Sequence, residues 1–339
     1  MYFVPKSEVT IGKIKLFGER SGIVSTEITS SVKDLCGTAK IVLPRNFAKK
    51  DGTGILENIA VNDEVTIRLG YDKTTETEFK GYVTKIGDGT PIVIECEDEM
   101  SRFKRMPQIR KSWETPTLKQ ILEDVLGQMI ENVPDVILSG GFIAKDATPF
   151  EVLKGLKDSY GFCIRDVGDK KLRCFYPYAM TDYKTHTYYF GTRNEQGIKE
   201  MNEKNVFANV AKNDLKFTRK EDRKVLITAK SKQKDGKDIK VEVGDRTSDT
   251  KRTLNCSPCL SESEIRKFAE SELKRMVFDG YEGKITGFGI PSTRSGDGLE
   301  LADYDNPERG GIYLIEAVTV KYGFSTGFRR ENSLSYKIK

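Results

Sequence analysis

The chain has 339 residues, of which 37% are hydrophobic, and its 56 basic and 51 acidic side chains give a net charge of +5. This length allows a substantial core and predicts two or three domains. No run of about 18 apolar residues occurs, so no membrane-spanning helix is expected. The N-terminus lacks the basic start and apolar core of a signal peptide, so synthesis in the host cytoplasm is expected.

Residues 1–107 are predicted to form a first β-barrel domain. Apolar and polar side chains alternate through much of this region, as they do in half-buried antiparallel strands. Strands are expected at residues 9–16, 21–28, 38–44, 61–71, 79–86 and 91–100. The alternation slips near Gly81, which predicts a β-bulge there. The barrel core is expected to consist of Val65, Ile67, Leu69, Phe79, Val83, Ile92 and Ile94.

Residues 108–190 are predicted to form a small α+β insertion domain, because the spacing of apolar residues changes to that of helices. The first helix is expected to have Thr115 as its N-cap with Pro116 at its first position. Thr148 and Glu151 form a capping box that opens a second helix. A hairpin is expected to turn at residues 168–169 and to place Cys163 opposite Cys174.

Residues 191–339 are predicted to form a second β-barrel domain with one amphipathic helix. A hairpin is expected around residues 235–236, and Ser261 with Glu264 forms the capping box of the helix. The second barrel core is expected to consist of Ile285, Leu299, Leu301, Tyr313, Ile315 and Val318. The predicted fold class is therefore α+β and β-rich, with two β-barrel-like domains and a small α/β insertion.

The residue types needed for catalysis or metal binding do not converge in this sequence. His186 is the only histidine, and its surroundings indicate a strand with exposed polar positions, which favours an ordinary strand residue over a catalytic base. Cys256 and Cys259 have the spacing of a zinc pair, but no second pair follows, so a metal site is rejected. Glu95, Glu97 and Glu99 are expected to share the solvent face of one strand. No catalytic residue, metal or cofactor is predicted.

The order of these segments resembles that of the baseplate hub proteins of contractile phage tails. That group includes the late-control D-type proteins, the T4-like tail hub and the base of type VI secretion spike proteins. The alternating strands of residues 61–105 carry the resemblance first. The helix and hairpin that begin at residue 148 match the family's small helical insertion, and the strands of residues 283–320 match its closing barrel.

The resemblance implies a non-enzymatic structural protein of a phage tail or phage-like contractile injection particle. The protomer would form a hub-like ring as a homotrimer that joins the hexameric tail tube to the trimeric spike. The implied partners are the spike, tail tube, tape-measure and other baseplate proteins, with DNA or effectors only as cargo in the lumen and no membrane. The chain ends at Lys339 without a fused spike extension, so a separate spike protein is expected. Phage tails, bacteriocin-like particles and secretion devices, contractile or not, all remain compatible with the sequence.

Two other function classes stay open. A carbohydrate- or protein-binding β-domain would have similar strand content, although a carbohydrate site should show clustered aromatics and the chain has one tryptophan, Trp113. A carboxylate-based hydrolase using residues 95–99 is the weaker alternative. Residues 203–252 hold 15 basic against 9 acidic side chains. Such a basic segment is compatible with a nucleic acid or an acidic partner, but it reads most simply as a solvated hairpin. Its ribbon from Lys216 to Lys240 is the candidate interface for an acidic partner, through Lys230, Lys232, Lys234 and Lys237.

Overall fold

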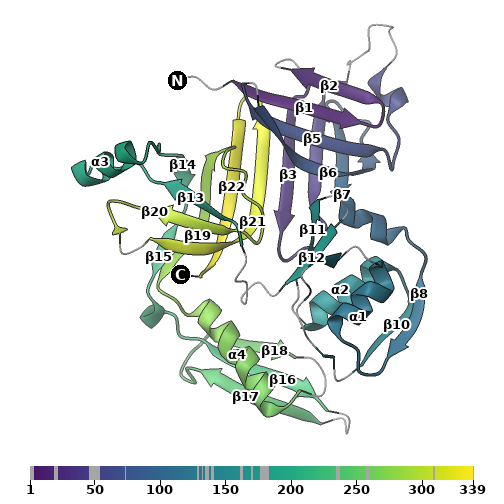
Figure 1. Cartoon of the computed structure of the whole chain (residues 1–339), viewed down its shortest axis with the longest axis vertical. Coiled ribbons are helices and arrows are strands. Elements are labelled where there is room, and N and C mark those ends of the chain that lie inside the picture. The colour runs from purple at the N-terminus through teal and green to yellow at the C-terminus, as the bar shows by residue number, and fades with distance from the viewer. Residues whose placement is uncertain are drawn as a thin grey trace.

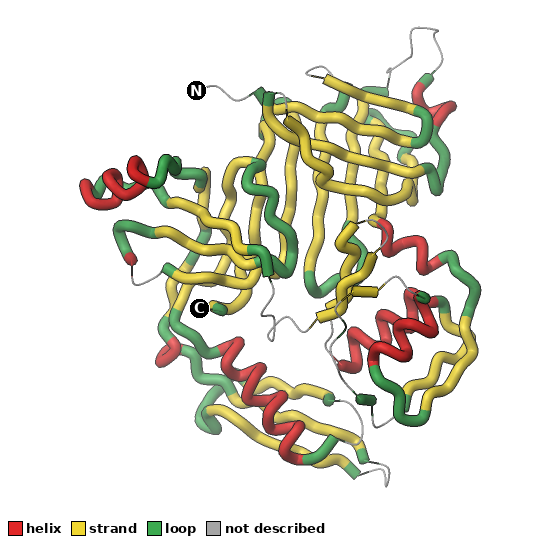
Figure 2. Tube along the Cα trace, in the orientation of Figure 1, coloured by secondary structure: helices red, strands yellow, loops and turns green. Residues whose placement is uncertain are grey.

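The computed structural model is built mainly of β-strands. It describes residues 4–18, 22–45, 54–72, 74–127, 130–131, 133, 137–138, 141–160, 163–168, 171–175, 183–233, 237–256, 260–307 and 310–338. A large curled sheet occupies the centre, and two smaller helix-containing units lie beside one end of it (Figures 1 and 2). The expectation of a β-rich α+β fold is confirmed.

The N-terminal part of the large sheet is antiparallel. Its strands are β1 (Pro5–Ile11), β2 (Ile14–Gly18), β3 (Ser25–Ser31), β4 (Thr38–Leu43), β5 (Glu64–Tyr71), β6 (Thr74–Ile86) and β7 (Ile92–Asp98), in the order β3-β4-β7-β6-β5-β1-β2. Two 3-10 helices, η1 (Ile55–Asn58) and η2 (Glu99–Lys104), flank them. The prediction of one strand at residues 9–16 is wrong, because Gly12 adopts a positive φ of 53° and turns the chain into a hairpin that pairs Ile11 with Ile14.

The C-terminal strands continue the same sheet. They are β13 (Thr185–Tyr189), β14 (Val210–Asn213), β15 (Lys216–Thr218), β19 (Gly280–Phe288), β20 (Gly298–Ala302), β21 (Gly311–Gly323) and β22 (Gly327–Lys337). A helix, α3 (Glu195–Glu203), and a 3-10 helix, η4 (Lys220–Asp222), interrupt them. Strand β21 pairs with β3 from Ala317–Ser31 to Gly323–Ser25, so the two sets of strands form one continuous sheet.

One hydrophobic cluster spans both sets of strands. All thirteen residues expected in the two barrel cores belong to it and are at most 5% exposed. Burying a Val, Leu or Ile side chain contributes about 1.5–3 kcal/mol, so this cluster is the main source of stability for the curled sheet. Asn209 bridges β13 and β14, because its Oδ1 accepts the Tyr189 N–H at 2.8 Å and its Nδ2 donates to the Thr187 carbonyl at 3.2 Å.

A bulge in β6 lies three residues before the predicted position. Ile67 pairs with Phe79 and Arg68 with Thr77, so Glu78 is the extra residue and Gly81 is paired normally. Glu78 and Phe79 are consecutive residues that are both 5% exposed. The bulge therefore turns a carboxylate toward the interior, where regular alternation would have placed it on the opposite face. Gly81 is required for a different reason, since a Cβ there would lie 2.0 Å from the Glu97 carbonyl oxygen.

The insertion packs two helices against short strands. Its elements are β8 (Ile109–Trp113), α1 (Leu118–Leu126), β9 (Ile130–Glu131), β10 (Phe142–Ala147), α2 (Pro149–Tyr160), β11 (Cys163–Gly168) and β12 (Lys171–Phe175). Its core includes Met100 and Phe103 of η2, which joins it to the end of the large sheet. The N-cap of α1 is Thr117 and not Thr115, because the Thr117 hydroxyl accepts the Gln120 N–H. The Thr148–Glu151 capping box is confirmed.

The hairpin of the insertion has a different register from the predicted one. Cys163 pairs with Phe175, and Cys174 pairs with Ile164. The shift arises from an irregularity between Asp166 and Gly168, which adds a residue on one side of the turn. Both cysteines are free and buried.

A separate sheet and helix form between β15 and β19. The strands β16 (Leu226–Lys232), β17 (Asp238–Gly244) and β18 (Lys251–Asn255) lie in the order β17-β16-β18, and α4 (Glu262–Met276) packs against them. The antiparallel pairing of β16 with β17 and the Ser261–Glu264 capping box are both confirmed, whereas the predicted turn at residues 235–236 lies outside the described residues. Its hydrophobic cluster, which includes Ile227, Val241 and Ile265, is distinct from that of the large sheet. The domain boundaries near residues 107 and 190 stay predictions.

Candidate interaction sites

A buried ion pair joins the N-terminal and C-terminal strands of the sheet. Arg330 Nη2 lies 2.5 Å from Glu78 Oε1, and Arg330 is fully buried. Its other nitrogens donate to the carbonyl oxygens of Gly289 and Thr293, each at 3.0 Å. Hydrogen bonds from all three guanidinium nitrogens to oxygen atoms offset the desolvation penalty of burying this charge. The pair therefore fixes β6 against β22 and against the segment that follows β19.

Polar groups around this pair extend the connection. Arg294 Nη1 donates to the Glu78 carbonyl at 2.9 Å and lies 3.3 Å from Glu78 Oε2. The buried Asn332 accepts a hydrogen bond from the Thr293 hydroxyl and donates one to Tyr188 Oη at 3.0 Å. Burial raises the pKa of Tyr188, so its hydroxyl stays protonated at neutral pH. The inward-facing stripe of β22 is thus polar in its middle and apolar on either side.

The Asp297 carboxylate contacts three further parts of the chain. Its Oδ2 lies 3.0 Å from His186 Nε2 and accepts the Arg294 backbone N–H at 3.1 Å, and its Oδ1 lies 3.5 Å from Arg165 Nη2. His186 is in a strand, as predicted, but it is buried and not exposed. Burial lowers the pKa of Arg165, and the Asp297 carboxylate opposes that effect. Since Arg165 belongs to the insertion, this contact ties the insertion to the second set of strands.

A cavity of about 580 Å³ lies beside these groups. Its lining includes Thr29 and Ser30 of β3, Glu78 of β6, Val320 of β21 and Arg330 of β22. Four charged side chains in its wall, those of Glu78, Arg165, Arg294 and Arg330, are paired with one another, with Asp297 or with backbone oxygens, as described above. Within the described residues, His186 makes no hydrogen bond to a Ser, Thr or Cys side chain. We therefore interpret these polar groups as contacts that hold the sheet in its curled form.

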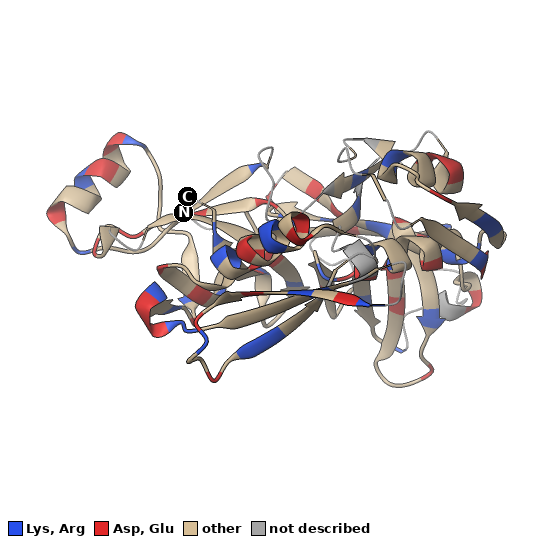
Figure 3. Cartoon of the chain, turned by 90° about the horizontal axis from the view of Figure 1, so that it is seen from below, with Lys and Arg blue, Asp and Glu red and all other residues tan. Residues whose placement is uncertain are grey.

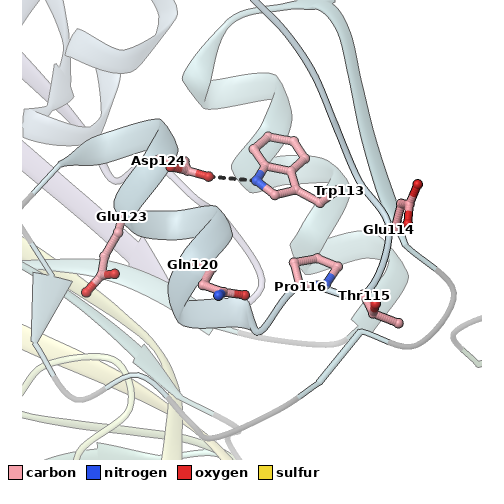
Figure 4. Close-up of a pocket in the computed structure, with 7 residues that line it drawn as sticks. All are labelled: Trp113, Glu114, Thr115, Pro116, Gln120, Glu123 and Asp124. Carbon is pink, nitrogen blue, oxygen red and sulfur yellow. Dashed lines mark hydrogen bonds between the residues drawn. The ribbon is translucent and has the colours of Figure 1, made fainter.

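Trp113 lies beside an open hollow of about 380 Å³ on the insertion (Figure 4). Its Nε1–H donates to Asp124 Oδ2 at 2.7 Å, and the same oxygen accepts from Lys111 Nζ at 2.7 Å. The hydrogen bond from Lys111 is the main cause that lowers the pKa of Asp124. The indole also packs near Phe142, with ring centroids 6.0 Å apart. Trp113 thus links β8 to α1 and β10, and its ring is engaged by its own chain.

Three of the four lysines of the predicted interface, Lys230, Lys232 and Lys237, lie in β16 or next to β17. Lys230 is half-buried on the central strand β16, and Lys237 is exposed beside the turn. The side chain of Lys232 and the whole of Lys234 lie outside the described residues. Lys240, the last residue of the predicted ribbon, is exposed on β17, and Lys251, which the sequence did not single out, is exposed on β18.

Cys256 directly follows β18, and the carboxylates of residues 95–99 lie in β7 and η2. Cys256 is half-buried, and burial raises its pKa, while Cys259 lies outside the described residues. Glu99 is not on the strand with Glu95 and Glu97, because the Asp98 carboxylate accepts the Met100 N–H and starts η2. In the described parts of the chain, no group of three or more His, Cys, Asp or Glu is placed to hold a metal ion. Likewise, no helix there is both long and apolar enough to cross a membrane.

Exposed apolar residues gather where β21 turns into β22. Phe324 in that turn is 80% exposed, and Val24, which precedes the β3 strand that pairs with β21, is 39% exposed. Phe288 and Ile290, which flank the end of β19 beside Arg329, are 41% and 51% exposed. Apolar patches of this kind often mark surfaces that another subunit covers.

The fold is similar to those of solved tail proteins over nearly the whole chain. A tail protein from Neisseria meningitidis MC58 has 12% sequence identity and a TM-score of 0.66, and the match covers 98% of this chain and 96% of that one. The 43 kDa tail protein of prophage MuSo2 from Shewanella oneidensis has 18% identity and a TM-score of 0.63, with 98% of each chain covered.

A third similar structure belongs to a secretion system. It is an E. coli component of the type VI secretion system described as structurally similar to the T4 bacteriophage tail proteins gp27 and gp5. It has 10% identity and a TM-score of 0.55, and the match covers 97% of this chain and 76% of that one. No protein-family model and no curated protein sequence matches the chain. The chain therefore has the fold of phage tail proteins and of this type VI secretion component, as the sequence resemblance predicted.

Proposed function

We propose that this chain is a structural hub of the baseplate in a phage tail or phage-like contractile injection particle, and that it is not an enzyme. The observation that carries the proposal is the likeness in fold to two tail proteins and a type VI secretion component across at least 97% of the chain. A likeness confined to one barrel would have supported only a shared module. The exposed apolar patch at the β21–β22 turn is consistent with a protein that functions inside an assembly.

In this proposal the protein is a homotrimer. The two sets of strands in each protomer would build a ring with six similar sectors, which matches a hexameric tail tube on one side and a trimeric spike on the other. Among the described strands, the main path of the sheet ends in β2 and β14, each of which is paired on one side only. Open edges of this kind expose backbone N–H and C=O groups that a neighbouring chain can cover. Spike, tail tube, tape-measure and other baseplate proteins are the proposed partners, with DNA or effectors passing only as cargo.

The first test is the native mass by light scattering over a range of protein concentrations. A mass near three times 38.3 kDa, alone or after mixing with the spike protein of the same particle, is the expected result. A spike protein from an unrelated particle serves as the control and should leave the mass unchanged. A chain that stays monomeric with both its own spike and its own tube protein would contradict the proposal.

A further inference from the structure

The sheet formed by β16, β17 and β18 has one covered face and one open face. Helix α4 packs on the face that carries Ile227, Ala229 and Val241. Because side chains alternate across a strand, the neighbouring residues point the other way. Among the described side chains, the open face therefore carries Leu226, Thr228 and Lys230 of β16, Asp238, Lys240 and Glu242 of β17, and Lys251 and Thr253 of β18. Figure 3 views the molecule from the end that holds this sheet, with Lys and Arg in blue.

Two lysines face each other at the centre of the open face. Lys230 on β16 is paired directly with Lys240 on β17. Like charges directly opposite each other on adjacent strands destabilise a sheet. Neither lysine forms an ion pair with a carboxylate within the described residues. The stability of the folded sheet therefore does not explain why these two lysines face each other.

Protection of a sheet edge does not explain the pairing of Lys230 with Lys240 either. Lysines on edge strands prevent unwanted pairing with other chains, and Lys240 on the edge strand β17 could serve that purpose. Lys230 lies on the central strand β16, and both edges of this strand are already paired, one with β17 and the other with β18. A lysine in that position adds no protection to an edge.

A third lysine extends the charged surface along the strands. Lys251 on β18 is paired with Leu226, four residues along β16 from Lys230. At about 3.3 Å per residue, the two lysines are separated by about 13 Å along the strand direction. Two carboxylates share this face, and that of Glu242 lies 3.5 Å from Arg246 and is thus paired with another cation. The open face therefore presents three lysines, together with the carboxylate of Asp238 at the start of β17.

We propose that this lysine face binds an acidic segment of a partner polypeptide in extended conformation. Carboxylates four positions apart in such a segment lie on one side and are about 13 Å apart, which is the separation of Lys230 and Lys251 along the strands. The described open face carries no aromatic side chain, and single-stranded nucleic acids bind by stacking their bases on aromatics. An acidic polypeptide therefore fits better than a nucleic acid. The proposal does not depend on the assignment as a hub.

The test measures binding of a fluorescent peptide of about ten residues with alternating Glu and Thr by fluorescence anisotropy. The wild-type protein should bind it, and binding should weaken as salt screens the charges. The triple variant Lys230→Gln, Lys240→Gln, Lys251→Gln should lose about tenfold in affinity or more. The matched control is Lys13→Gln, Lys145→Gln, Lys154→Gln, which removes the same charge from lysines exposed elsewhere and should retain nearly full affinity.

Three results would overturn the proposal. The first is a wild-type protein that does not bind the acidic peptide at low salt. The second is an equal loss of affinity in the control variant, which would make net charge the cause. The third is tighter binding of a short DNA duplex that disappears in the same triple variant, which would assign the face to nucleic acid. Circular dichroism must show both variants folded, and Lys240→Gln alone provides a milder variant at an exposed edge position.

Discussion

Glu78 and Arg330 are separated by 252 residues in the sequence, yet their side chains meet at 2.5 Å in the interior. One belongs to a bulge in β6, and the other to the inward-facing stripe of β22. The contact fixes the position of the C-terminal strands against the N-terminal ones at a point where neither side is apolar. Four predictions follow from this contact and from other features of the fold.

Removing either member of the ion pair should destabilise the protein strongly. Arg330→Met leaves the Glu78 carboxylate buried without its main partner, and Glu78→Gln leaves the Arg330 cation without its counter-charge. Loss of one partner of a buried pair costs roughly 3–5 kcal/mol. Urea unfolding followed by circular dichroism measures the effect. The double variant should be less destabilised than the sum of the two single variants, and strictly additive effects would show that the two charges are not coupled.

Gly81→Ala should be far more destabilising than its size suggests. The added Cβ would lie 2.0 Å from the Glu97 carbonyl oxygen, so β6 and β7 must separate locally. We expect a loss of at least about 2 kcal/mol in the free energy of unfolding. Gly89→Ala is the matched control, because its nearest contact is the Pro91 carbonyl oxygen at 3.5 Å. Equal melting temperatures for the two variants would show that the strands tolerate the methyl group.

The contribution of Cys96 to stability should depend on pH. Burial raises the pKa of this thiol to about 12, whereas a thiol in the unfolded chain ionises near 8.5. Above that pH the unfolded chain binds fewer protons than the folded one, so stability falls as pH rises, by about 1.4 kcal/mol per unit until the folded thiol also ionises. The destabilisation caused by Cys96→Ala should therefore shrink between about pH 9 and 12.

The comparison of wild type and Cys96→Ala also needs a pH range in which the thiol does not ionise in either state. Between pH 6 and about 8 the thiol is protonated in both states, and the difference in unfolding free energy should be constant. Chemical denaturation at a series of pH values gives both ranges. A difference that stays constant up to pH 12 would mean that the folded thiol ionises normally.

Ser261→Ala should weaken the sheet-and-helix unit built on β16, β17 and β18. The Ser261 hydroxyl accepts the Glu264 N–H, and the Glu264 carboxylate accepts the Ser261 N–H at 2.8 Å. Loss of such a cap costs about 1 kcal/mol. Ser261→Asp should retain most of the stability, because aspartate is also a good N-cap. Hydrogen exchange of the α4 amides measures the local effect, and unchanged exchange in Ser261→Ala would contradict it.

Local patterns in the sequence predicted the elements that depend on neighbouring residues. The alternation of Val65, Ile67 and Leu69 reports a buried strand face, and the capping boxes at Thr148 and Ser261 need only residues three positions apart. The predicted core residues were found from the same alternation of apolar and polar side chains. In each case the signal that identified a residue lies within a few positions of it in the sequence.

The missed features depend on distant contacts or on single-residue shifts. The bulge at Glu78 moves one residue to the other face, and its partner Arg330 is far along the chain. His186 has polar neighbours in sequence, which indicated exposure, but Asp297 covers it. Helix α3 is short and mostly polar, so its capping residue Asn194 and its buried Met201 gave only a weak pattern. The lysine face can be recognised only from the pairing of three strands, which places Lys240 opposite Lys230 and Lys251 on the same face.

The pairing of β3 with β21 has a consequence for how the protein is made. Strand β3 has left the ribosome long before residues 311–323 are synthesised, and until then one of its edges has no partner. Every prematurely terminated chain keeps that edge open, and open edges promote aggregation. Pairing between such distant segments is also slow, because a long loop must close first. Completion of the sheet thus waits for the synthesis of residues 311–323.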